Sequence, residues 1–432
     1  MTTVQAYRRL RSSGLQWIPE IPEHWRVVPS WAIARQVRRS PTTGDGIVTA
    51  FRDGQVTLRA KRRTDGFTEA IQEHGYQGVR RGELVIHSMD GFAGAIGVSD
   101  SDGKMSPVAH IYSVRDGEPR YFALLLRVMA LGGFVESLAK GIRERSTAFD
   151  RATFKSLSLP VPPLEEQRSI LAYLDRETAQ IDAFIAKNEE LIALLTERRA
   201  AVIGRAVTRG LSEVAPLSSD GPEWIGQVPA AWSVRPIKAE YTVVVGKMLN
   251  ESKSEGDLVP YVRAANIQPH GLDLSDIKEM KATVPERTSL ALRAGDVVFV
   301  EGGGGYGRSD FLTEDLAGWV FQNHVIRLRP RRGHDGRFLN YWLQHVRMIG
   351  HYEALSAFAT IPNVSGDKLG RIEMPVPPLE EQRRLVEYID GATKRIDDAI
   401  NVARRGVEFA KERRAALISA AVTGKIDVRG AA

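Results

Sequence analysis

The glycine-rich run at 302–309 is the segment whose residue types come closest to a nucleotide-binding site. It reads Gly302-Gly-Gly-Gly-Tyr-Gly-Arg-Ser309 and nearly fits the phosphate-loop pattern GxxxxGK[ST], with Arg308 where the pattern has lysine. A short apolar run at 297–300 predicts the strand that must come before such a loop, but 310–316 is a poor start for the helix that must follow. We therefore expect a glycine-rich turn here, or a close approach of the backbone to a ligand.

Other catalytic chemistry has little support in the residue types. The chain has no cysteine, and its nine histidines show no HExxH spacing. No GxSxG nucleophile motif occurs, and there is no Asn/Asp-Pro-Pro-aromatic tetrapeptide of the kind that amino-methyltransferases use. His110 and His324, which the sequence places at equivalent positions in two similar halves of the chain, could contact a ligand or could be structural imidazoles. The sequence thus predicts no catalytic residue, no metal site and no cofactor bound by this chain.

Clusters of arginine and lysine indicate a polyanionic partner. The formal net charge is +6, and 25–159 carries 20 basic and 14 acidic residues against 18 and 17 for 232–374. Such side chains can contact DNA phosphates or guanine edges, although a solvated surface is the alternative interpretation. The candidate DNA-contacting residues are Arg59, Lys61, Arg62, Arg63, Arg80, Arg81, Arg143, Arg145, Tyr306, Arg308, Arg327 and Arg329.

An internal duplication organises the elements that must position these residues. The nine residues of 160–168, Pro-Val-Pro-Pro-Leu-Glu-Glu-Gln-Arg, recur unchanged at 375–383, an offset of 215. Upstream, Trp17-Ile18 matches Trp224-Ile225 at an offset of 207, so the second copy is longer between its anchors. Each copy therefore consists of a variable globular block followed by a closely repeated segment.

The repeated segments are predicted to be long helices. Two prolines before Leu164-Glu-Glu-Gln are typical of a helix start, and a helix from Leu164 to Val207 would be roughly 65 Å long. Because its own block cannot cover such a helix, we expect it to pair with its repeat about a pseudo-two-fold axis as a coiled coil; two separate hairpins are the alternative. The predicted helix–helix seam consists of Leu174, Ile181, Ile185, Ile192, Leu195, Val202, Ile389, Ile396, Ile400, Val407 and Leu417.

The predicted fold class is α+β, because the variable blocks mix short β-rich runs with turn residues and a few helical stretches. Two globular α/β domains are separated by the two long helices, and the duplication predicts a pseudo-two-fold arrangement. The expected boundaries are 1–159 for the first domain with its N-terminal segment and 160–208 for the first helix. A linker and the second domain follow over 209–374, and the second helix with its tail occupies 375–432.

Hydropathy indicates a protein outside the membrane. The N-terminal residues lack the apolar stretch of a signal peptide, and no apolar run approaches the roughly 20 residues of a membrane span. We therefore expect a cytoplasmic location.

The duplicated Pro-x-Pro-Pro-Leu-Glu-Glu-Gln-Arg motif, the preamble at 13–25 and the phrase Gly94-Ala-Ile-Gly97…Ser106-Pro107 together resemble one family over essentially the whole chain. That family is the DNA-specificity subunit of type I restriction-modification systems. The chain departs from the family at 106–110, where Ser-Pro-Val-Ala-His replaces the frequent Ser-Pro-Asp-Tyr. The resemblance implies two target-recognition domains that each read one half of a split DNA sequence. The two helices would form an antiparallel coiled coil that sets the gap between the halves.

The same resemblance implies partners. Double-stranded DNA, two modification subunits carrying S-adenosylmethionine, and restriction subunits using ATP and Mg would assemble on a chain that is itself not an enzyme. Two other functions stay open from the residues alone. One is a coiled-coil scaffold that bridges proteins without reading a DNA sequence, and the other is a nucleotide-dependent enzyme that uses the glycine-rich run at 302–309.

Overall fold

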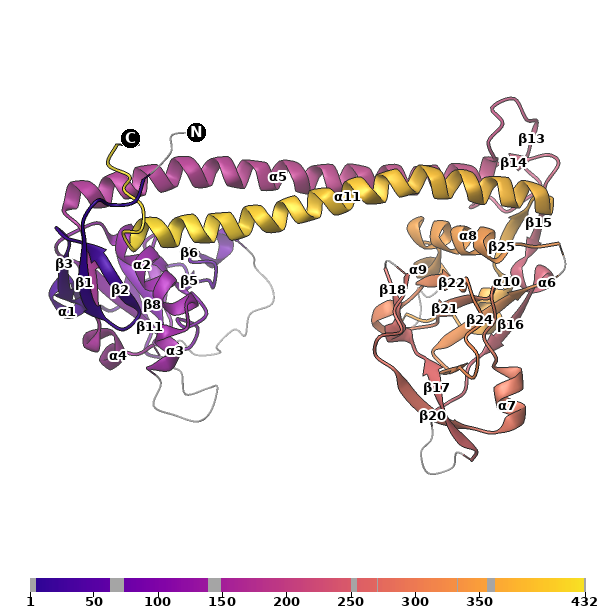
Figure 1. Ribbon diagram of the computed structural model, residues 1–432, viewed down its shortest axis with the longest axis horizontal. Coiled ribbons are helices and arrows are strands. Elements are labelled where there is room, and N and C mark those ends of the chain that lie inside the picture. The colour runs from indigo at the N-terminus through magenta and orange to yellow at the C-terminus, as the bar shows by residue number, and fades with distance from the viewer. Residues whose placement is uncertain are drawn as a thin grey trace. The chain divides into compact units, whose positions relative to one another are not determined.

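The chain forms two compact units in a computed structural model, which describes residues 5–62, 74–138, 149–249, 255–269, 271–331, 333–355 and 362–430 (Figure 1). The first unit comprises Met1–Asn188 with Arg405–Ala432, and the second comprises Glu189–Arg404. Each unit contains one globular block and a part of each of two long helices.

The first block combines short strands with small helices. Its strands are β1 (Leu10–Leu15), β2 (Ile18–Pro22), β3 (Arg26–Pro29), β4 (Ala34–Val37), β5 (Val48–Ala50), β6 (Val56–Leu58), β7 (Gln77–Val79), β8 (Leu84–His87), β9 (Ile96–Val98), β10 (Gly103–Met105), β11 (Ala109–Val114) and β12 (Ser158–Val161). Its helices are α1 (Ser30–Ile33), η1 (Arg59–Lys61), α2 (Pro119–Leu131), α3 (Phe134–Ser137) and α4 (Arg151–Ser156).

The second block has a comparable set of elements. Its strands are β13 (Leu217–Ser218), β14 (Val228–Pro229), β15 (Ser233–Pro236), β16 (Tyr241–Val245), β17 (Asp257–Val262), β18 (Ile267–Gln268), β19 (Gly271–Leu272), β20 (Lys278–Ala282), β21 (Val297–Val300), β22 (Ser309–Phe311), β23 (Val320–Phe321), β24 (Val325–Pro330) and β25 (Glu373–Val376). Its helices are α6 (Ile237–Glu240), η3 (Ala264–Asn266), α7 (Val284–Ser289), η4 (Gly303–Gly305), α8 (Gly336–Met348), α9 (His351–Leu355) and α10 (Gly366–Arg371).

Both blocks are built on the same four-stranded antiparallel sheet. The strand order is β4-β11-β8-β9 in the first block and β16-β24-β21-β22 in the second. One amphipathic helix packs on each sheet: α2 buries Phe122, Leu125 and Met129 and α8 buries Phe338 and Trp342, at the three- and four-residue spacing of a helix face. The duplication therefore repeats the folding frame, although the sequences between its anchors have diverged.

The surfaces around the shared frame differ. The first block adds the strand pairs β5-β6 and β10-β7, whereas the second adds the three-stranded sheet β20-β17-β23. Apolar side chains under these additions form separate small cores, one around Val48, Val79 and Ile111 and the other around Val262 and Phe321. The frame is thus kept while the surface that each block presents has changed.

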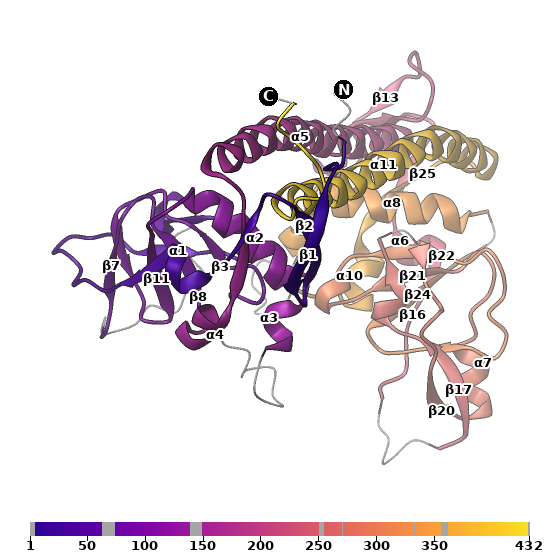
Figure 2. The same ribbon diagram turned by 60° about the vertical axis from the view of Figure 1, so that its left-hand side comes forward.

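The two long helices are α5 (Leu164–Arg209) and α11 (Leu379–Val422), which run side by side in both views (Figures 1 and 2). In the second unit the Arg199 Nε donates to the Asp397 Oδ1 at 2.9 Å, and in the first unit the Arg414 Nε donates to the Asp182 Oδ1 at 2.8 Å. Position 199 corresponds to 414 and position 182 to 397, so the two ion pairs are the same contact made twice with the helices exchanged. The helices are therefore antiparallel and pair with two-fold equivalence.

Every residue of the predicted seam is buried or half-buried. Leu174, Ile181, Ile389, Ile396, Ile400 and Val407 are buried, while Ile185, Ile192, Leu195, Val202 and Leu417 are half-buried. Ala403 and Ala410 are also buried on α11, where small side chains let the backbones approach.

Candidate nucleic-acid interface

The glutamine of the repeated motif joins each block to its long helix. The Gln167 Oε1 accepts the Glu118 backbone N–H at 2.9 Å, and its Nε2 donates to the Pro162 carbonyl at 3.0 Å. The same two bonds recur at Gln382, to the Asp335 N–H at 2.9 Å and to the Pro377 carbonyl at 2.8 Å. Glu118 and Asp335 precede α2 and α8, so each glutamine fixes the block's main helix against the start of a long helix.

A second repeated contact lies about two turns further along each long helix. Arg120 of α2 pairs with Asp175 of α5 at 2.6 Å, and Arg337 of α8 pairs with Asp390 of α11. Asp175 and Asp390 are equivalent positions of the duplication. The repeated motif is therefore explained by the need to hold two blocks in the same way, and it supplies the rigid base for any binding surface.

The predicted DNA contacts of the first block at 59–62 are engaged with neighbouring protein groups. The Arg62 guanidinium lies 2.6 Å from the Asp53 carboxylate and over the Phe51 ring. The Lys61 Nζ lies 2.9 Å from the Ser101 Oγ, and Arg59 contacts Thr49. These side chains hold the β6–η1 turn against the block, and a phosphate would have to compete with those partners.

Arg80 and Arg81 lie in the turn before β8, both exposed. The Arg80 Nη1 lies 3.5 Å from the Asp102 Oδ2, and the Arg81 backbone N–H donates to the Asp102 Oδ1 at 2.8 Å. Arg63, Arg143 and Arg145, the remaining candidates of this block, lie outside the described residues.

The candidates of β24 have structural contacts. Arg327 is 4% exposed and donates to the backbone carbonyls of Ser289 and Ala291 at 3.1 and 2.6 Å. Arg329 makes a two-bond ion pair with the Asp296 carboxylate, 2.7 Å for each bond, and that carboxylate is buried. Because both guanidinium groups stabilise the second block, we assign them no DNA contact.

The glycine-rich run is followed by a strand. After β21 and the short η4 turn the chain enters β22, so the helix whose N-terminus a phosphate loop requires is replaced by extended chain. Gly307 has a φ of 71°, and a Cβ there would lie 2.8 Å from the Tyr352 ring. The Tyr306 hydroxyl donates to the Tyr352 carbonyl at 2.8 Å, and Arg308 is half-buried beside it. The run is a tight packed turn, and the nucleotide-site hypothesis is dropped.

The two histidines that the sequence suggested as equivalent are not equivalent in the sheets. Val37 of β4 and Val244 of β16 occupy equivalent positions in the shared sheet. Ile111 pairs with Val37 in the first block, and Arg327 pairs with Val244 in the second, so Ile111 and Arg327 are equivalent. The position of β24 that corresponds to His110 is therefore Ile326, and His324 lies two residues before it. The interpretation of a shared histidine site was wrong because a register cannot be read from a single matching residue in a diverged stretch.

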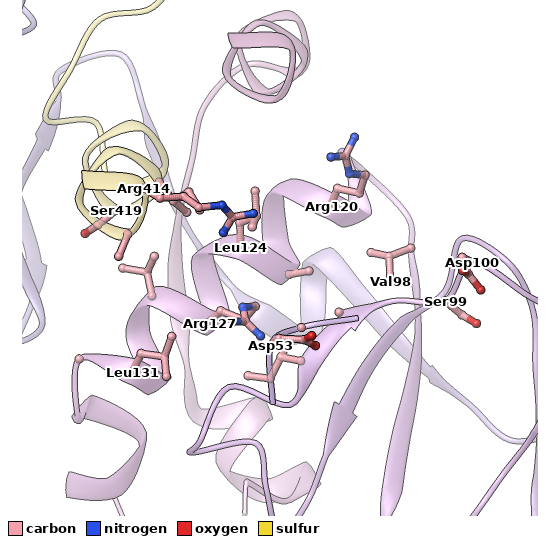
Figure 3. A pocket seen from close by; sticks show the side chains of 18 of the residues that line it. Asp53, Val98, Ser99, Asp100, Arg120, Leu124, Arg127, Leu131, Arg414 and Ser419 are labelled. Carbon is pink, nitrogen blue, oxygen red and sulfur yellow. The ribbon is translucent and has the colours of Figure 1, made fainter. Parts of the chain in front are cut away.

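A cleft of about 960 Å³ lies between α2, the β9 region and the last turns of α11 within the first unit (Figure 3). Several of its polar side chains have protein partners: Arg127 donates to the Arg52 carbonyl at 3.1 Å and to the Gly94 carbonyl, and the Ser99 hydroxyl donates to the Ser101 carbonyl. Burial lowers the pKa of Arg127. The cleft is thus a junction between the first block and α11. The side chains labelled in Figure 3 do not form a nucleophile–base pair.

A further set of cations went unnoticed in the sequence because its members are far apart along the chain. Five exposed side chains gather on one face of the first block, formed by α1, β4, β11 and α4: Arg35, Arg38, Arg115, Arg151 and Lys155. We call this set, with the 60% exposed Trp31, the arginine face. Within the described parts of the chain none of its five cations makes an ion pair.

Two adjoining clefts of about 500 Å³ each hollow the arginine face, and both are lined by Gln36 and Arg38. The Tyr112 hydroxyl lines one cleft and the His110 ring the other, and each has a buried polar atom without a hydrogen-bond partner among the described residues. Burial raises the pKa of Tyr112 and lowers that of His110. The nearby Asp150 carboxylate caps α4 by accepting the Thr153 N–H at 2.8 Å, which lowers its pKa.

The described part of the chain has neither a metal-binding cluster nor a membrane-spanning helix. Over these residues, no three His, Asp or Glu side chains are grouped so that they could hold a metal ion. Among the described helices, none is both long and apolar enough to cross a membrane.

Comparison with known proteins gives the family. Residues 231–402 match the model of the type I restriction modification DNA specificity domain. The putative type I restriction enzyme MjaX specificity subunit of Methanocaldococcus jannaschii is 26% identical over 322 residues, 72% of this chain and 69% of that protein. The chain thus resembles the type I restriction-modification DNA-specificity subunits, and residues 231–402 match their specificity domain. This confirms the predicted resemblance and a subunit that is not itself an enzyme.

Other specificity subunits and solved structures agree. The EcoKI specificity subunit of Escherichia coli is 24% identical over 46% of this chain and 44% of that protein. A structure described as the basis of complex assembly and conformational transition of the type I R-M system covers 94% of this chain and 99% of its own, with TM-score 0.65 and 18% identity. The HsdS subunit from Thermoanaerobacter tengcongensis gives TM-score 0.50 at 17% identity. These likenesses confirm the predicted specificity-subunit fold of two α/β domains and two long helices.

Proposed function

We propose that this specificity subunit reads a bipartite DNA target, one half with each globular block, while α5 and α11 set the gap between the halves. The observation that carries the proposal is the repeated sheet, β4-β11-β8-β9 and β16-β24-β21-β22, with different additions around it. One frame used twice with two different surfaces suits two unrelated half-sites. Recognition through base edges requires such a difference in surface side chains. The boundaries 1–159, 160–208, 209–374 and 375–432 stay our proposed division into reading domains and spacing helices.

The long helices also offer a surface for partner subunits. Apolar side chains outside the seam are exposed on both helices: Phe184, Leu191, Leu194, Val402 and Phe409 are between 45 and 67% exposed. Exposed apolar groups of this size mark protein–protein contacts. We propose that two modification subunits, which would carry S-adenosylmethionine, dock there, and that restriction subunits using ATP and Mg join the complex. The resulting complex would act on DNA in the cytoplasm.

Selection from a random library of duplexes tests the proposed function. The chain assembled with its modification subunit should enrich two short sequence blocks separated by an indifferent spacer of fixed length. A coiled-coil scaffold would bind duplex DNA without preferring one sequence over random competitor. Enrichment of one contiguous sequence, or of none, contradicts the proposal.

A further inference from the structure

We propose that the arginine face of the first block binds the phosphate backbone of duplex DNA. The inference rests on the proposed function and names where one block meets the DNA. It differs from the first-block positions that the charge clusters of the sequence suggested and that the structure describes, which lie in the turns at 59–62 and 80–81.

The charge of the arginine face is available to a ligand. Arg35, Arg38 and Arg151 are exposed and have no ion pair within the described residues, whereas Arg62 and Arg80 of the sequence clusters face Asp53 and Asp102. An unpaired cation can neutralise a phosphate at once and release the counterions condensed on the DNA there, which drives binding. A paired cation must first give up its carboxylate. The same number of positive charges therefore contributes more at the arginine face.

The two clefts of this face are lined by residues whose buried polar atoms have no hydrogen-bond partner among the described residues. Neither cleft is lined by an acidic side chain. Tyr112 is 2% exposed and lines one cleft, and its buried hydroxyl has no hydrogen-bond partner among the described residues. A buried hydroxyl left unpaired costs free energy, so a bound acceptor such as a phosphate oxygen would recover it.

The second block shows that the fold does not need these cations. At the equivalent positions of β16, Thr242 and Val245 stand where the first block has Arg35 and Arg38. In α10, Gly366 and Gly370 replace Arg151 and Lys155 of α4. The same frame forms in the second unit with small or apolar residues at these four positions, so folding does not require Arg35, Arg38, Arg151 and Lys155. Arg115 differs, because the equivalent position holds Arg331.

Duplex DNA fits this surface better than an acidic protein does. Four of the five cations are arginines, whose planar guanidinium matches the oxygens of a phosphate. The cations are spread over a strand edge and a helix, with an exposed Trp31 and the Gln36 amide between them, and are not gathered around one apolar anchor. Spread cations suit a regularly spaced polyanion, whereas a protein interface depends on buried central anchors.

The test measures how duplex binding by the full chain depends on salt. Random-sequence duplex of about 30 base pairs is titrated with wild type and with the triple variant Arg35→Gln/Arg38→Gln/Arg151→Gln over a series of salt concentrations. Each lost phosphate contact lowers the slope of log K against log salt by about 0.9, so we expect the slope to fall by at least about two units. The matched control is Lys61→Gln/Arg62→Gln/Arg80→Gln, which removes the same formal charge and should lower it by less than about one unit.

A second variant keeps the result interpretable if the triple variant folds poorly. Arg115→Gln/Lys155→Gln removes two other cations of the same face and should lower the slope by about two units. Equal slope losses for the triple variant and its control would reduce the effect to net charge and overturn the inference. So would an unchanged slope with loss of binding to the modification subunit, because the face would then be a protein contact.

The proposed function fails by a different result. A wild-type chain that binds DNA without sequence preference contradicts sequence reading, whatever the slopes of the variants. A wild-type preference together with unchanged variant slopes contradicts only the arginine face.

Discussion

Glutamine is the residue on which the attachment of each block depends. Gln167 and Gln382 are 2% and 0% exposed, and each satisfies both a backbone N–H and a backbone carbonyl that no water can reach easily. The neighbouring prolines set up these bonds, because Pro162 and Pro377 present the carbonyls that accept from the two side-chain amides. An unchanged nine-residue motif is thus expected wherever the same junction is built twice.

We predict that Gln167→Ala and Gln382→Ala each lower the free energy of unfolding by about 1–3 kcal/mol, since each leaves a buried N–H and a buried carbonyl unpaired. Urea denaturation followed by tryptophan fluorescence measures the change. Gln180→Ala on the exposed face of α5 is the control, expected to change stability by less than about 0.5 kcal/mol. Two glutamine variants as stable as the control would contradict the role of the junction.

Side-chain partners mark the limit of prediction from sequence at this scale. The motif residues could be singled out because they are repeated, but the role of Arg327 could not, because burial against two carbonyls depends on the neighbouring α7–β21 connection. The arginine face is a harder case. Arg35 and Arg151 are 116 positions apart and meet only when β4 and α4 pack in one block.

At the scale of elements, the pairing of α5 and α11 was predictable from apolar periodicity and length, because a long helix must cover its apolar stripe, and the family resemblance implied its antiparallel sense. The exact partners were not, since several seven-residue registers satisfy the same periodicity. The reciprocal pairs Arg199–Asp397 and Arg414–Asp182 select one register. Their equivalence also explains why Glu-Arg-Arg-Ala-Ala recurs at 197–201 and 412–416.

The paired helices predict how a spacer should respond to insertion. Seven residues inserted into both helices, after Asn188 and after Arg404, keep the seam in phase and lengthen each helix by about 10 Å. We expect the preferred gap between half-sites to grow by about three base pairs, at 3.4 Å per step along a strand, with the same bases read at each end. Duplex selection measures the gap.

A single insertion provides the control for the paired one. Seven residues added to α5 alone would shift Arg199 relative to Asp397 and should lower the thermal midpoint without giving a defined new gap. An unchanged gap after the paired insertion would show that the helices do not set the spacing.

The exposed apolar side chains of the helices predict a loss of partner binding when they become polar. Phe184→Ser/Phe409→Ser, both within the first unit, should weaken association with the modification subunit at least about tenfold, because large aromatic anchors carry much of an interface's energy. Size-exclusion binding assays measure this. The control Ala186→Ser, also exposed on α5, should bind as wild type does. Normal assembly of the double variant would place the partner elsewhere.

At the scale of the whole molecule, each unit contains two half-buried histidines whose pKa is lowered by burial: His87 and His110 in the first, His345 and His351 in the second. The unfolded chain therefore binds more protons than the folded one as the pH falls through the ordinary histidine pKa of 6.5 and below. The stability from these neutral imidazoles is complete above that value and is lost progressively toward acid.

We expect the thermal midpoint to be lower at pH 5.5 than at pH 7.5, in buffers of equal ionic strength. His345→Gln should reduce the difference, because one titrating group is removed, while His324→Gln at an exposed site should keep it. A midpoint that rises toward pH 5.5 would contradict the sign of these pKa shifts.

The two-unit organisation itself could be predicted from the duplication, because an offset of 215 residues holds over the whole of each repeated helix segment. What each block presents to DNA could not be, because the offset drifts through the blocks and the surface is made where residues are not repeated. The correction at His110 and the discovery of the arginine face both arise in that diverged region. The repeated sheet and helices thus account for the two-block organisation, and we attribute sequence specificity to the surface residues that differ between the blocks.

The central claim is that the two globular blocks read two half-sites at a fixed separation. Its most direct test is to map methylated bases in the genome of a host that expresses this chain with its modification subunit. The account predicts that all methylated sites fit one pattern of two short, unrelated sequences separated by an indifferent gap of constant length. Removing 232–374 should abolish the requirement for one of the two sequences. Methylation at a single contiguous sequence, or at sites with no sequence in common, would contradict the account.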